Sequence, residues 1–253
     1  MNVQRDIAYG ADPRNLLDVF TPAAAFSEPR KVFIFVHGGG FTRGDRRAPG
    51  SPFYDNVMMW AAKNNMIGVS MTYRLAPKDL WPAGGHDVGL AVRWVMKNIG
   101  AHGGDPKKVF LMGQSAGAIH VASFLADEKL HITKNTGLAG ALMLSGLFSI
   151  TPQLTVAEPP VKLYFGDDAT KYAQRSSLIG LLQLRLPMWV AYSEFDPPAF
   201  ELQSEILNHS LCTVGRCPSF YRFAGHSHMS EIYSIHSDDP TIGDSMWNFV
   251  KAN

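Results

Sequence analysis

Apolar and polar positions follow two patterns along this chain. Short continuous apolar runs predict strands buried on both faces of a parallel sheet, and apolar residues every three or four positions predict amphipathic helices. The expected strands are 2–9, 15–20, 31–36, 66–72, 108–112, 138–145, 187–193 and 219–223. The expected helices are 53–64, 88–99, 116–126, 199–210 and 241–251. Because strands and helices alternate throughout, the pattern predicts one α/β domain over 1–253, with a mostly parallel, doubly wound sheet of about eight strands.

Two segments depart from this alternation. The first two strands flank a turn signal at residues 10–13, which predicts an antiparallel hairpin at the edge of the sheet. Residues 147–186 contain Pro152, Pro159 and Pro160 and show little periodicity. We therefore expect 147–186 to be an insertion that covers one end of the sheet as a short cap or lid.

Candidate chemistry gathers where the predicted strands end. In an open parallel sheet, functional groups collect at the carboxyl ends of the strands. The segment 37–40, Ser115, Asp196 and His228 each follow a predicted strand. We therefore expect these four candidates, which are far apart in the sequence, to meet at one rim of the fold.

Ser115 stands at the centre of Gly113-Gln-Ser-Ala-Gly117, between a strand and a small-residue helix. A serine hydroxyl becomes an effective nucleophile only when it is pushed clear of the backbone and a base can reach it. A sharp strand-to-helix turn exposes the serine, and the glycines two before and two after it let strand and helix nearly touch. We interpret Ser115 as a nucleophile, with a Gly-rich turn that carries no chemistry as the alternative.

Acyl transfer by a serine also requires a base and a group that orients the base. Asp196 is the candidate acid, with a helix N-cap as its alternative role and Glu194 as a substitute acid. His226 and His228 both follow the last strand; we favour His228 as the base and expect His226 to serve the structure. A metal set of His226, His228, Glu231 and His236 is disfavoured, because the His-x-His spacing suits zinc but no second ligand cluster accompanies it. We expect no cofactor and no metal.

The glycines of 38–40 suit an oxyanion-binding loop. Backbone amides can approach a substrate oxygen only where no side chain blocks them. Gly39, Gly40 and Ala116 would supply three such amides, and His37 would anchor the loop. The sequence lacks Gly-Lys-Ser/Thr and Gly-x-Gly-x-x-Gly opening a helix, so the run is a poor phosphate-binding loop.

Composition narrows the class of partner. The 253 residues are 46% hydrophobic and carry a net charge of +1, which gives no electrostatic footprint for nucleic acid or an anionic membrane. Residues 1–6 lack the apolar core of a signal peptide, and no stretch approaches membrane-spanning length, so the expected location is the cytoplasm.

Cys212 and Cys217 could close a small loop, but two free thiols are the favoured state. Phe41, Trp81, Phe148 and Phe195 could line an acyl or alcohol pocket, with plain core as the alternative.

Several motifs together resemble a known family. These are His37-Gly-Gly-Gly-Phe41, Tyr73-Arg-Leu-Ala-Pro77 with Trp81-Pro-Ala83 and Asp87, the segment around Ser115, and Glu194-Phe-Asp-Pro197. In this order they resemble the α/β-hydrolase esterases, especially the hormone-sensitive-lipase type carboxylesterases and the small bacterial esterases and arylformamidases. Three features depart from the first branch: too few residues precede the hairpin to build its N-terminal cap, Gln114 replaces its usual Asp, and Gly-His-Ser-His ends the last strand.

The resemblance implies a serine carboxylesterase of the α/β-hydrolase fold. Ser115 would be the nucleophile, Asp196 the acid and His228 the base, with Gly39, Gly40 and Ala116 as oxyanion donors. The expected partner is a small-molecule ester with a small to medium acyl group, and a homodimer is left open. Two alternatives are an arylformamidase-like hydrolase of amides or formamides and a non-catalytic small-molecule receptor. The receptor is disfavoured because the histidine is present.

Overall fold

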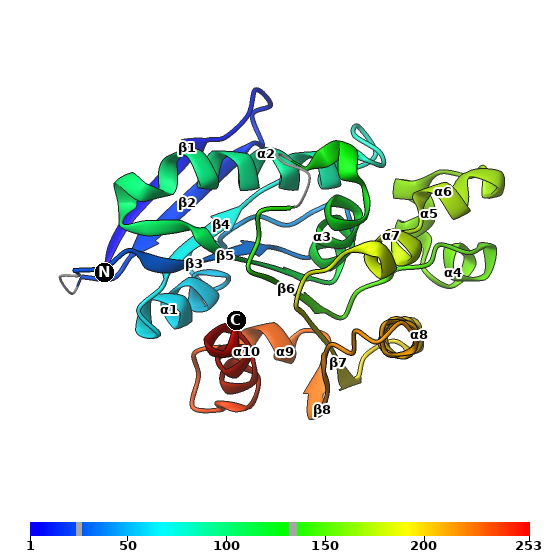
Figure 1. Ribbon diagram of the computed structural model, residues 1–253. Helices are drawn as coiled ribbons and strands as arrows, with labels where there is room; N and C mark the ends of the chain where they lie inside the picture. The colour runs from blue at the N-terminus through cyan, green and yellow to red at the C-terminus, as the bar shows by residue number, and fades with distance from the viewer. Residues whose placement is uncertain (24–26, 132–135) are drawn as a thin grey trace.

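One eight-stranded sheet organises the protein in the computed structural model, which describes residues 1–23, 27–131 and 136–253 (Figure 1). The strand order is β1-β2-β4-β3-β5-β6-β7-β8. Both β1/β2 and β2/β4 pair antiparallel, whereas all later pairs are parallel. The strands are β1 (Asn2–Ala8), β2 (Leu16–Thr21), β3 (Arg30–Val36), β4 (Ile67–Met71), β5 (Gly104–Gln114), β6 (Gly140–Leu144), β7 (Met188–Phe195) and β8 (Ser219–Ser227). The predicted mostly parallel sheet with an antiparallel N-terminal hairpin is confirmed.

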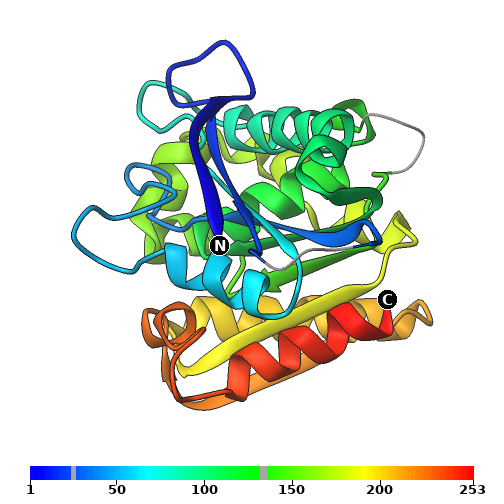
Figure 2. The same cartoon turned by 90° about the vertical axis from the view of Figure 1, so that its left-hand side faces the viewer.

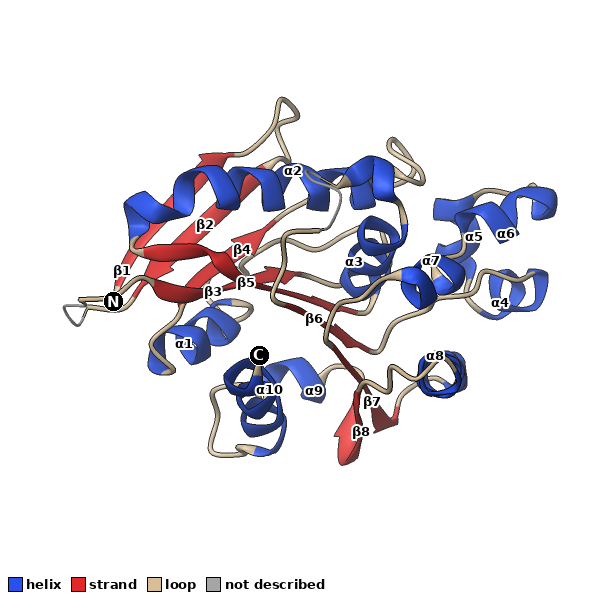
Figure 3. Cartoon of the chain, viewed as in Figure 1, coloured by secondary structure: helices blue, strands red, loops and turns tan. Residues whose placement is uncertain are grey.

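Helices cover both faces of this sheet, as the doubly wound pattern predicts. The longer helices are α1 (Asp55–Lys63), α2 (Ala83–Asn98), α3 (Ala116–Ala126), α8 (Pro198–Thr213) and α10 (Thr241–Ala252). In Figure 3, α2 and α3 lie above the sheet and α1 and α10 below it. One apolar cluster packs α2, α3 and α8 against the sheet, and a second packs α1, α10 and the short α9 (Ser230–Tyr233) against the other face.

Strand β3 shows how one strand serves both cores. Val32, Ile34 and Val36 join the first cluster, while Phe33 and Phe35 join the second. Successive side chains of a strand point to opposite faces, so a strand buried on both sides reads as a continuous apolar run. The position of β3 between β4 and β5, inside the sheet, explains its sequence.

Buried Asp18 ties the N-terminal hairpin to the rest of the molecule. Its carboxylate, on β2, accepts hydrogen bonds from Arg5 on β1 at 2.8 Å, from Arg46 at 2.8 Å and from Arg47 at 2.9 Å. The side chain of Asp18 is fully buried. Burial raises the pKa of this carboxyl, but the guanidinium groups of Arg5 and Arg46 outweigh burial and hold the pKa below its usual value. The network fastens the loop that follows β3 onto the hairpin, which Figure 2 shows toward the viewer.

Residues 147–186 fold as a set of short helices at the carboxyl ends of the strands. They are α4 (Pro152–Ala157), α5 (Pro159–Phe165), the 3-10 turn Ala169–Lys171, α6 (Tyr172–Arg175) and α7 (Leu178–Gln183). Figure 1 shows α4, α5 and α6 beyond the end of the sheet, beside α3. Prolines begin both α4 and α5 because the first position of a helix needs no amide hydrogen. Residues 147–186 are therefore largely helical, and their role as a cap stays a prediction.

The state expected for the two cysteines is wrong. Cys212 and Cys217 form a disulfide, with their Cα atoms 4.1 Å apart. The physical reason is that α8 ends at Thr213 and Gly215, with φ at 73°, turns the chain back on itself. Among the described residues, no helix combines the length and apolar character needed to cross a membrane.

Candidate active site

The turn at Ser115 has the geometry that its glycines suggest. Ser115 follows β5 directly and precedes α3, with φ at 56° and ψ at −125°, a region that non-glycine residues rarely adopt. A Cβ on Gly113 would lie 2.4 Å from the carbonyl carbon of Gly117, and one on Gly117 would lie 2.1 Å from the oxygen of Val36. Strand and helix can therefore meet only if both positions are glycine, and the serine is held at the tip.

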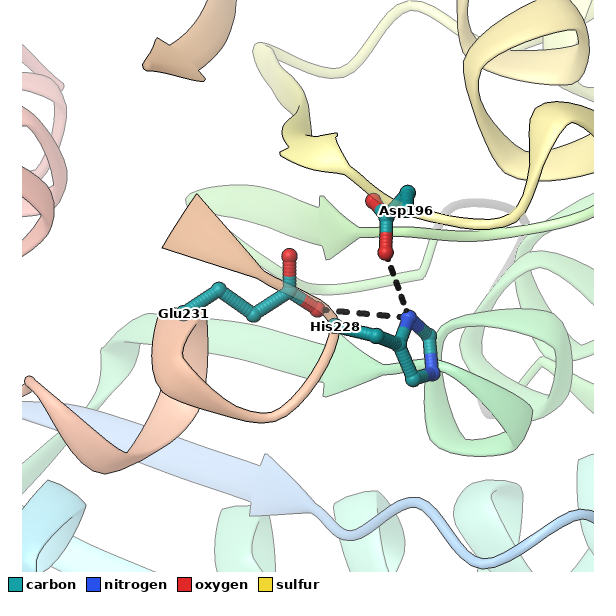
Figure 4. Close-up of side chains that lie close together, drawn as sticks. All are labelled: Asp196, His228 and Glu231. Carbon is teal, nitrogen blue, oxygen red and sulfur yellow. Dashed lines mark hydrogen bonds and ion pairs between the residues drawn. The ribbon is translucent and has the colours of Figure 1, made fainter. Parts of the chain in front are cut away.

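The imidazole of His228 lies between a hydroxyl and a carboxylate. Its Nε2 is 2.8 Å from the Oγ of Ser115, and its Nδ1 is 2.7 Å from Oδ1 of Asp196. Asp196 comes from the end of β7 and His228 from just past β8, and Figure 4 shows them facing each other. The structure thus brings together three side chains that the sequence separates by up to 113 positions. A carboxylate on Nδ1 leaves Nε2 free to take a proton from the hydroxyl.

Two opposing effects set the pKa of His228. Burial of the ring lowers it, but the hydrogen bond from Nδ1 to Asp196 and the negative charges around the ring outweigh burial. The net effect raises the pKa of His228 above 6.5. A base with such a pKa binds a proton more tightly than a free imidazole, which suits proton transfer from a hydroxyl.

Glu194 and His226, the alternatives to Asp196 and His228, have other partners. Glu194 points away from the imidazole, accepting a hydrogen bond from the amide of Gly225 at 2.7 Å and pairing with Arg222 at 3.1 Å. His226 places Nε2 3.2 Å from the carboxylate of Asp239. Within the described part of the chain, neither residue forms a hydrogen bond or ion pair with Ser115 or His228.

The set of His226, His228, Glu231 and His236 is not assembled. Among the described residues, the His, Cys, Asp and Glu side chains close enough to share a metal ion are Asp196, His228 and Glu231. The ring of His228 and the carboxylate of Asp196 already share a hydrogen bond. We interpret the three as a hydrogen-bonded cluster rather than as metal ligands.

The loop after β3 brings two glycine amides beside Ser115. Gly39, Gly40 and Ala116 line the same cavity as the serine. Gly39 has φ at 125°, and a Cβ there would lie 2.1 Å from the carbonyl oxygen of Arg43, so only glycine fits. The amide of Ala116 stands at the N-terminus of α3, where the helix dipole favours negative charge.

His37 holds this loop in place. It is fully buried, its Nδ1 lies 2.6 Å from the carbonyl oxygen of Gly38, and its ring stacks on Tyr73 with ring centres 4.4 Å apart. The hydroxyl of Tyr73 donates to the carbonyl of His37 at 2.8 Å. Burial lowers the pKa of His37 to about 4, so the ring is neutral at physiological pH and serves structure.

A cavity of about 460 Å³ opens around Ser115 and His228. Its apolar wall comes from α3, the loop after β6, the cap and α8: Ile119, Leu147, Val161 and Phe200. Phe41 lines it as expected, but three other proposed aromatics do not. Trp81 faces a second cavity beside α3, Phe148 is buried in the core, and the side chain of Phe195 is 65% exposed. The four residues of the apolar wall were not predicted from the sequence, because they belong to four different segments.

Ser145 and Glu231 also belong to the site, although sequence reasoning gave neither a role in the triad. Ser145 follows β6, and its Oγ lies 2.6 Å from Asp196 Oδ2 and 2.7 Å from Glu231 Oε2. Glu231 is the second residue of α9 and lies three positions after His228 in the sequence. The available signals were a serine at the carboxyl end of a strand and an acidic residue one turn past the histidine.

Solved structures of esterases share this fold. Esterase B from Lactobacillus rhamnosis superposes with a TM-score of 0.81 at 18% identity, covering 99% of this chain and 84% of that one. The esterase from the archaeon Pyrobaculum calidifontis superposes with a TM-score of 0.79 at 22% identity, covering 99% and 83%. The protein therefore has the α/β-hydrolase fold.

Sequence comparison agrees with the fold. The BD-FAE family model matches residues 17–139. Esterase LipQ of Mycobacterium tuberculosis is 31% identical over 212 residues, which are 79% of this chain and 48% of LipQ. The chain spans about half the length of LipQ and less of the other curated relatives it matches first. Together these comparisons show that the chain has the α/β-hydrolase fold and that its sequence is similar to those of esterases.

Proposed function

We propose that this protein is a serine carboxylesterase that hydrolyses small to medium acyl esters without a cofactor. The observation that supports this most strongly is the continuous line from Ser115 Oγ through the His228 ring to Asp196, with contacts of 2.8 and 2.7 Å. Ser115 and His228 line a cavity with an apolar wall. A nucleophile, its base, the group that orients the base and a place for an acyl chain are therefore adjacent.

In the proposed reaction, His228 removes the proton of Ser115 as its oxygen attacks the ester carbonyl. The amides of Gly39, Gly40 and Ala116 stabilise the oxyanion, and removal of one such donor typically costs about 3 kcal/mol in the transition state. Asp196 stabilises the imidazolium, which then protonates the departing alcohol. Water activated by His228 hydrolyses the acyl-enzyme and restores Ser115.

The cavity supports a limit on acyl size. A volume of about 460 Å³ must hold both the acyl and the alcohol portions of the ester. The cap closes one side of it through Glu158, Pro160 and Val161. Acetyl to medium-length acyl groups fit such a space better than the long chains of lipids.

The test is turnover of p-nitrophenyl acetate by the wild type and by Ser115→Ala. We expect the variant to lose at least about 10³-fold in kcat, because removal of a triad member leaves only binding and oxyanion stabilisation. Labelling by a fluorophosphonate probe provides a second readout that needs no turnover. Equal hydrolysis by both proteins, or an unlabelled wild type, contradicts the proposal and favours a binding protein without catalysis.

Three further parts of the proposal concern the whole chain. We propose that residues 1–253 act as one domain, with 147–186 as its cap, and that the protein is cytoplasmic and able to form a homodimer. In the cytoplasm, where thiols stay reduced, Cys212 and Cys217 would be free, so the state of this disulfide decides the location. Thiol titration of protein isolated under alkylating conditions tests the compartment, and light scattering after size-exclusion chromatography tests the dimer.

A further inference from the structure

Glu231 is a buried carboxyl that the proposed reaction does not use. Its side chain is fully buried, on the short helix α9 that follows His228. Figure 4 shows its carboxylate approaching Nδ1 of His228, the same ring nitrogen that Asp196 faces. The distance from Nδ1 is 3.8 Å to Glu231 Oε1 but 2.7 Å to Asp196 Oδ1. Asp196 therefore holds the hydrogen bond, and Glu231 needs another explanation.

The oxygen atoms around Glu231 require one more proton than the serines supply. Three oxygen–oxygen contacts have hydrogen-bond length: Ser145 Oγ to Asp196 Oδ2 at 2.6 Å, Ser145 Oγ to Glu231 Oε2 at 2.7 Å, and Ser193 Oγ to Glu231 Oε2 at 2.6 Å. Each such contact needs a hydrogen between its two oxygens. The two hydroxyls bring one hydrogen each. The third must reside on a carboxyl group, either that of Asp196 or that of Glu231.

The surroundings assign this proton to Glu231. Asp196 Oδ2 already accepts the backbone amide of Ser193 at 2.8 Å, and Oδ1 faces the Nδ1 hydrogen of His228. A hydrogen on either oxygen of Asp196 would therefore stand against a donor that already points at that oxygen. Apart from the serines, Glu231 accepts the side-chain amide of Gln114 at 2.9 Å on Oε1. A protonated Oε2 can accept from Ser193 and donate to Ser145, which satisfies every contact.

The charges that face Glu231 favour the same state. Three of its neighbours carry no charge: Gln114 from β5, Ser145 just after β6 and Ser193 from β7. Among the described residues, the titratable groups that face Glu231 are therefore Asp196 and His228. Burial and the charge of Asp196 raise the pKa of Glu231 to about 7, with a smaller opposing effect from His228. Two carboxylates this close do not both ionise readily.

We propose that Glu231 is a positioning residue held as a neutral carboxylic acid, whose proton is donated to Ser145 while the Ser145 hydroxyl donates to Asp196. This relay fixes the outer oxygen of Asp196 and leaves a single negative charge at the imidazole. The inference rests on the proposed esterase function for its kinetic consequences. The protonation state itself is independent of any activity.

The first test compares wild type with Glu231→Gln in p-nitrophenyl acetate hydrolysis across pH. Glutamine resembles a neutral acid, with an amide hydrogen for Ser145 and an oxygen for Gln114. We expect kcat to fall less than about ten-fold and the acid limb of kcat/KM to stay where it is. If Glu231 were ionised, its Oε1, 3.8 Å from Nδ1 of His228, would stabilise the imidazolium. Removing that charge would then shift the acid limb of kcat/KM to lower pH by about three units. A shift of that size overturns the proposal.

A matched pair of serine variants tests the relay. Ser145→Ala removes the hydroxyl that joins the two carboxyls, so we expect kcat to fall more than about ten-fold with KM little changed. Ser193→Ala removes one contact to Glu231 but keeps the backbone amide on Asp196, so its loss should be smaller. Equal losses in both variants, or a loss confined to KM, contradict the relay.

Infrared difference spectroscopy tests the protonation state of Glu231 without relying on catalysis. At pH 6, wild type minus Glu231→Gln should show the carbonyl band of a protonated carboxylic acid. Carboxylate bands alone refute the neutral state, whatever the enzyme hydrolyses. If Ser115→Ala hydrolyses the ester as fast as wild type, the proposed function fails while the infrared result still decides the state of Glu231.

Discussion

At the residue scale, the tautomer of His228 depends on a single contact. The hydrogen on Nδ1 points at Asp196, so the lone pair of Nε2 faces Ser115. The same contact raises the pKa of the ring against the effect of burial. The contact with Asp196 therefore sets the orientation of the proposed base and also contributes to its basicity.

Replacing that contact should change both properties. In Asp196→Asn, an amide can donate to Nδ1 and stabilise the tautomer whose Nε2 hydrogen blocks proton transfer, so we expect kcat to fall about 10⁴-fold. The acid limb of kcat/KM should also move to lower pH, because the pKa of His228 is raised in the native enzyme and loses its support. The pH–rate profile of ester hydrolysis measures both. The control is Glu194→Gln, two positions away and paired with Arg222 instead, which should keep near-native rates.

The sequence pointed to some of these residues because strand ends are visible in it. Ser115, Asp196 and His228 each follow an apolar run, and in a parallel sheet those ends converge. The relay through Ser145 and Glu231 was not foreseen, because it depends on which side-chain oxygen faces which across three segments. Composition and spacing carry no record of such contacts.

At the scale of elements, the junction of β3, β5 and α3 depends on close backbone approach. Gly117→Ala places a methyl carbon where the oxygen of Val36 stands, at 2.1 Å, so strand and helix must separate. We expect the free energy of unfolding to fall by about 1–3 kcal/mol, as for overpacked cores, and esterase activity to fall with it. Denaturant unfolding measures the first effect. Gly100→Ala is the control, since nothing lies within 4 Å of its added carbon, and a loss there equal to that at Gly117 contradicts the argument.

The longer elements were all predicted, although β5 begins four residues and α2 five residues before the expected start, whereas the short elements were predicted poorly. The helix at 116–126 was placed correctly and β3 missed by one residue, because each has enough positions to show its period. The cap helices α4, α6 and α7 have four to six residues each, about one turn, so no period could be read. The disulfide was missed for a related reason: the reversal at Gly215 that joins Cys212 to Cys217 is a local backbone state.

At the scale of the whole molecule, Asp18 fastens three segments that are distant in sequence. Arg5 belongs to β1 and also pairs with Asp55 of α1, while Arg46 and Arg47 belong to the loop that continues from Gly39 and Gly40. Arg46 is almost fully buried, and it also pairs with Asp6 and Asp45. The edge hairpin and the proposed oxyanion loop therefore share one buried anchor.

Neutralising this anchor should destabilise the fold in a pH-dependent way. Asp18→Asn leaves Arg46 buried with weaker partners, so we expect a loss of about 3 kcal/mol in the free energy of unfolding at pH 7. Because the native pKa of Asp18 is depressed, its contribution is present above about pH 4 and is lost as pH falls through the native pKa. The difference in the free energy of unfolding between wild type and variant should therefore shrink in acid.

The control is Asp167→Asn, which removes an exposed ion pair with Lys162 and should lower the free energy of unfolding by less than about 1 kcal/mol at either pH. Equal losses in the two variants at pH 7 would show that the buried network does not hold the hairpin and the loop together.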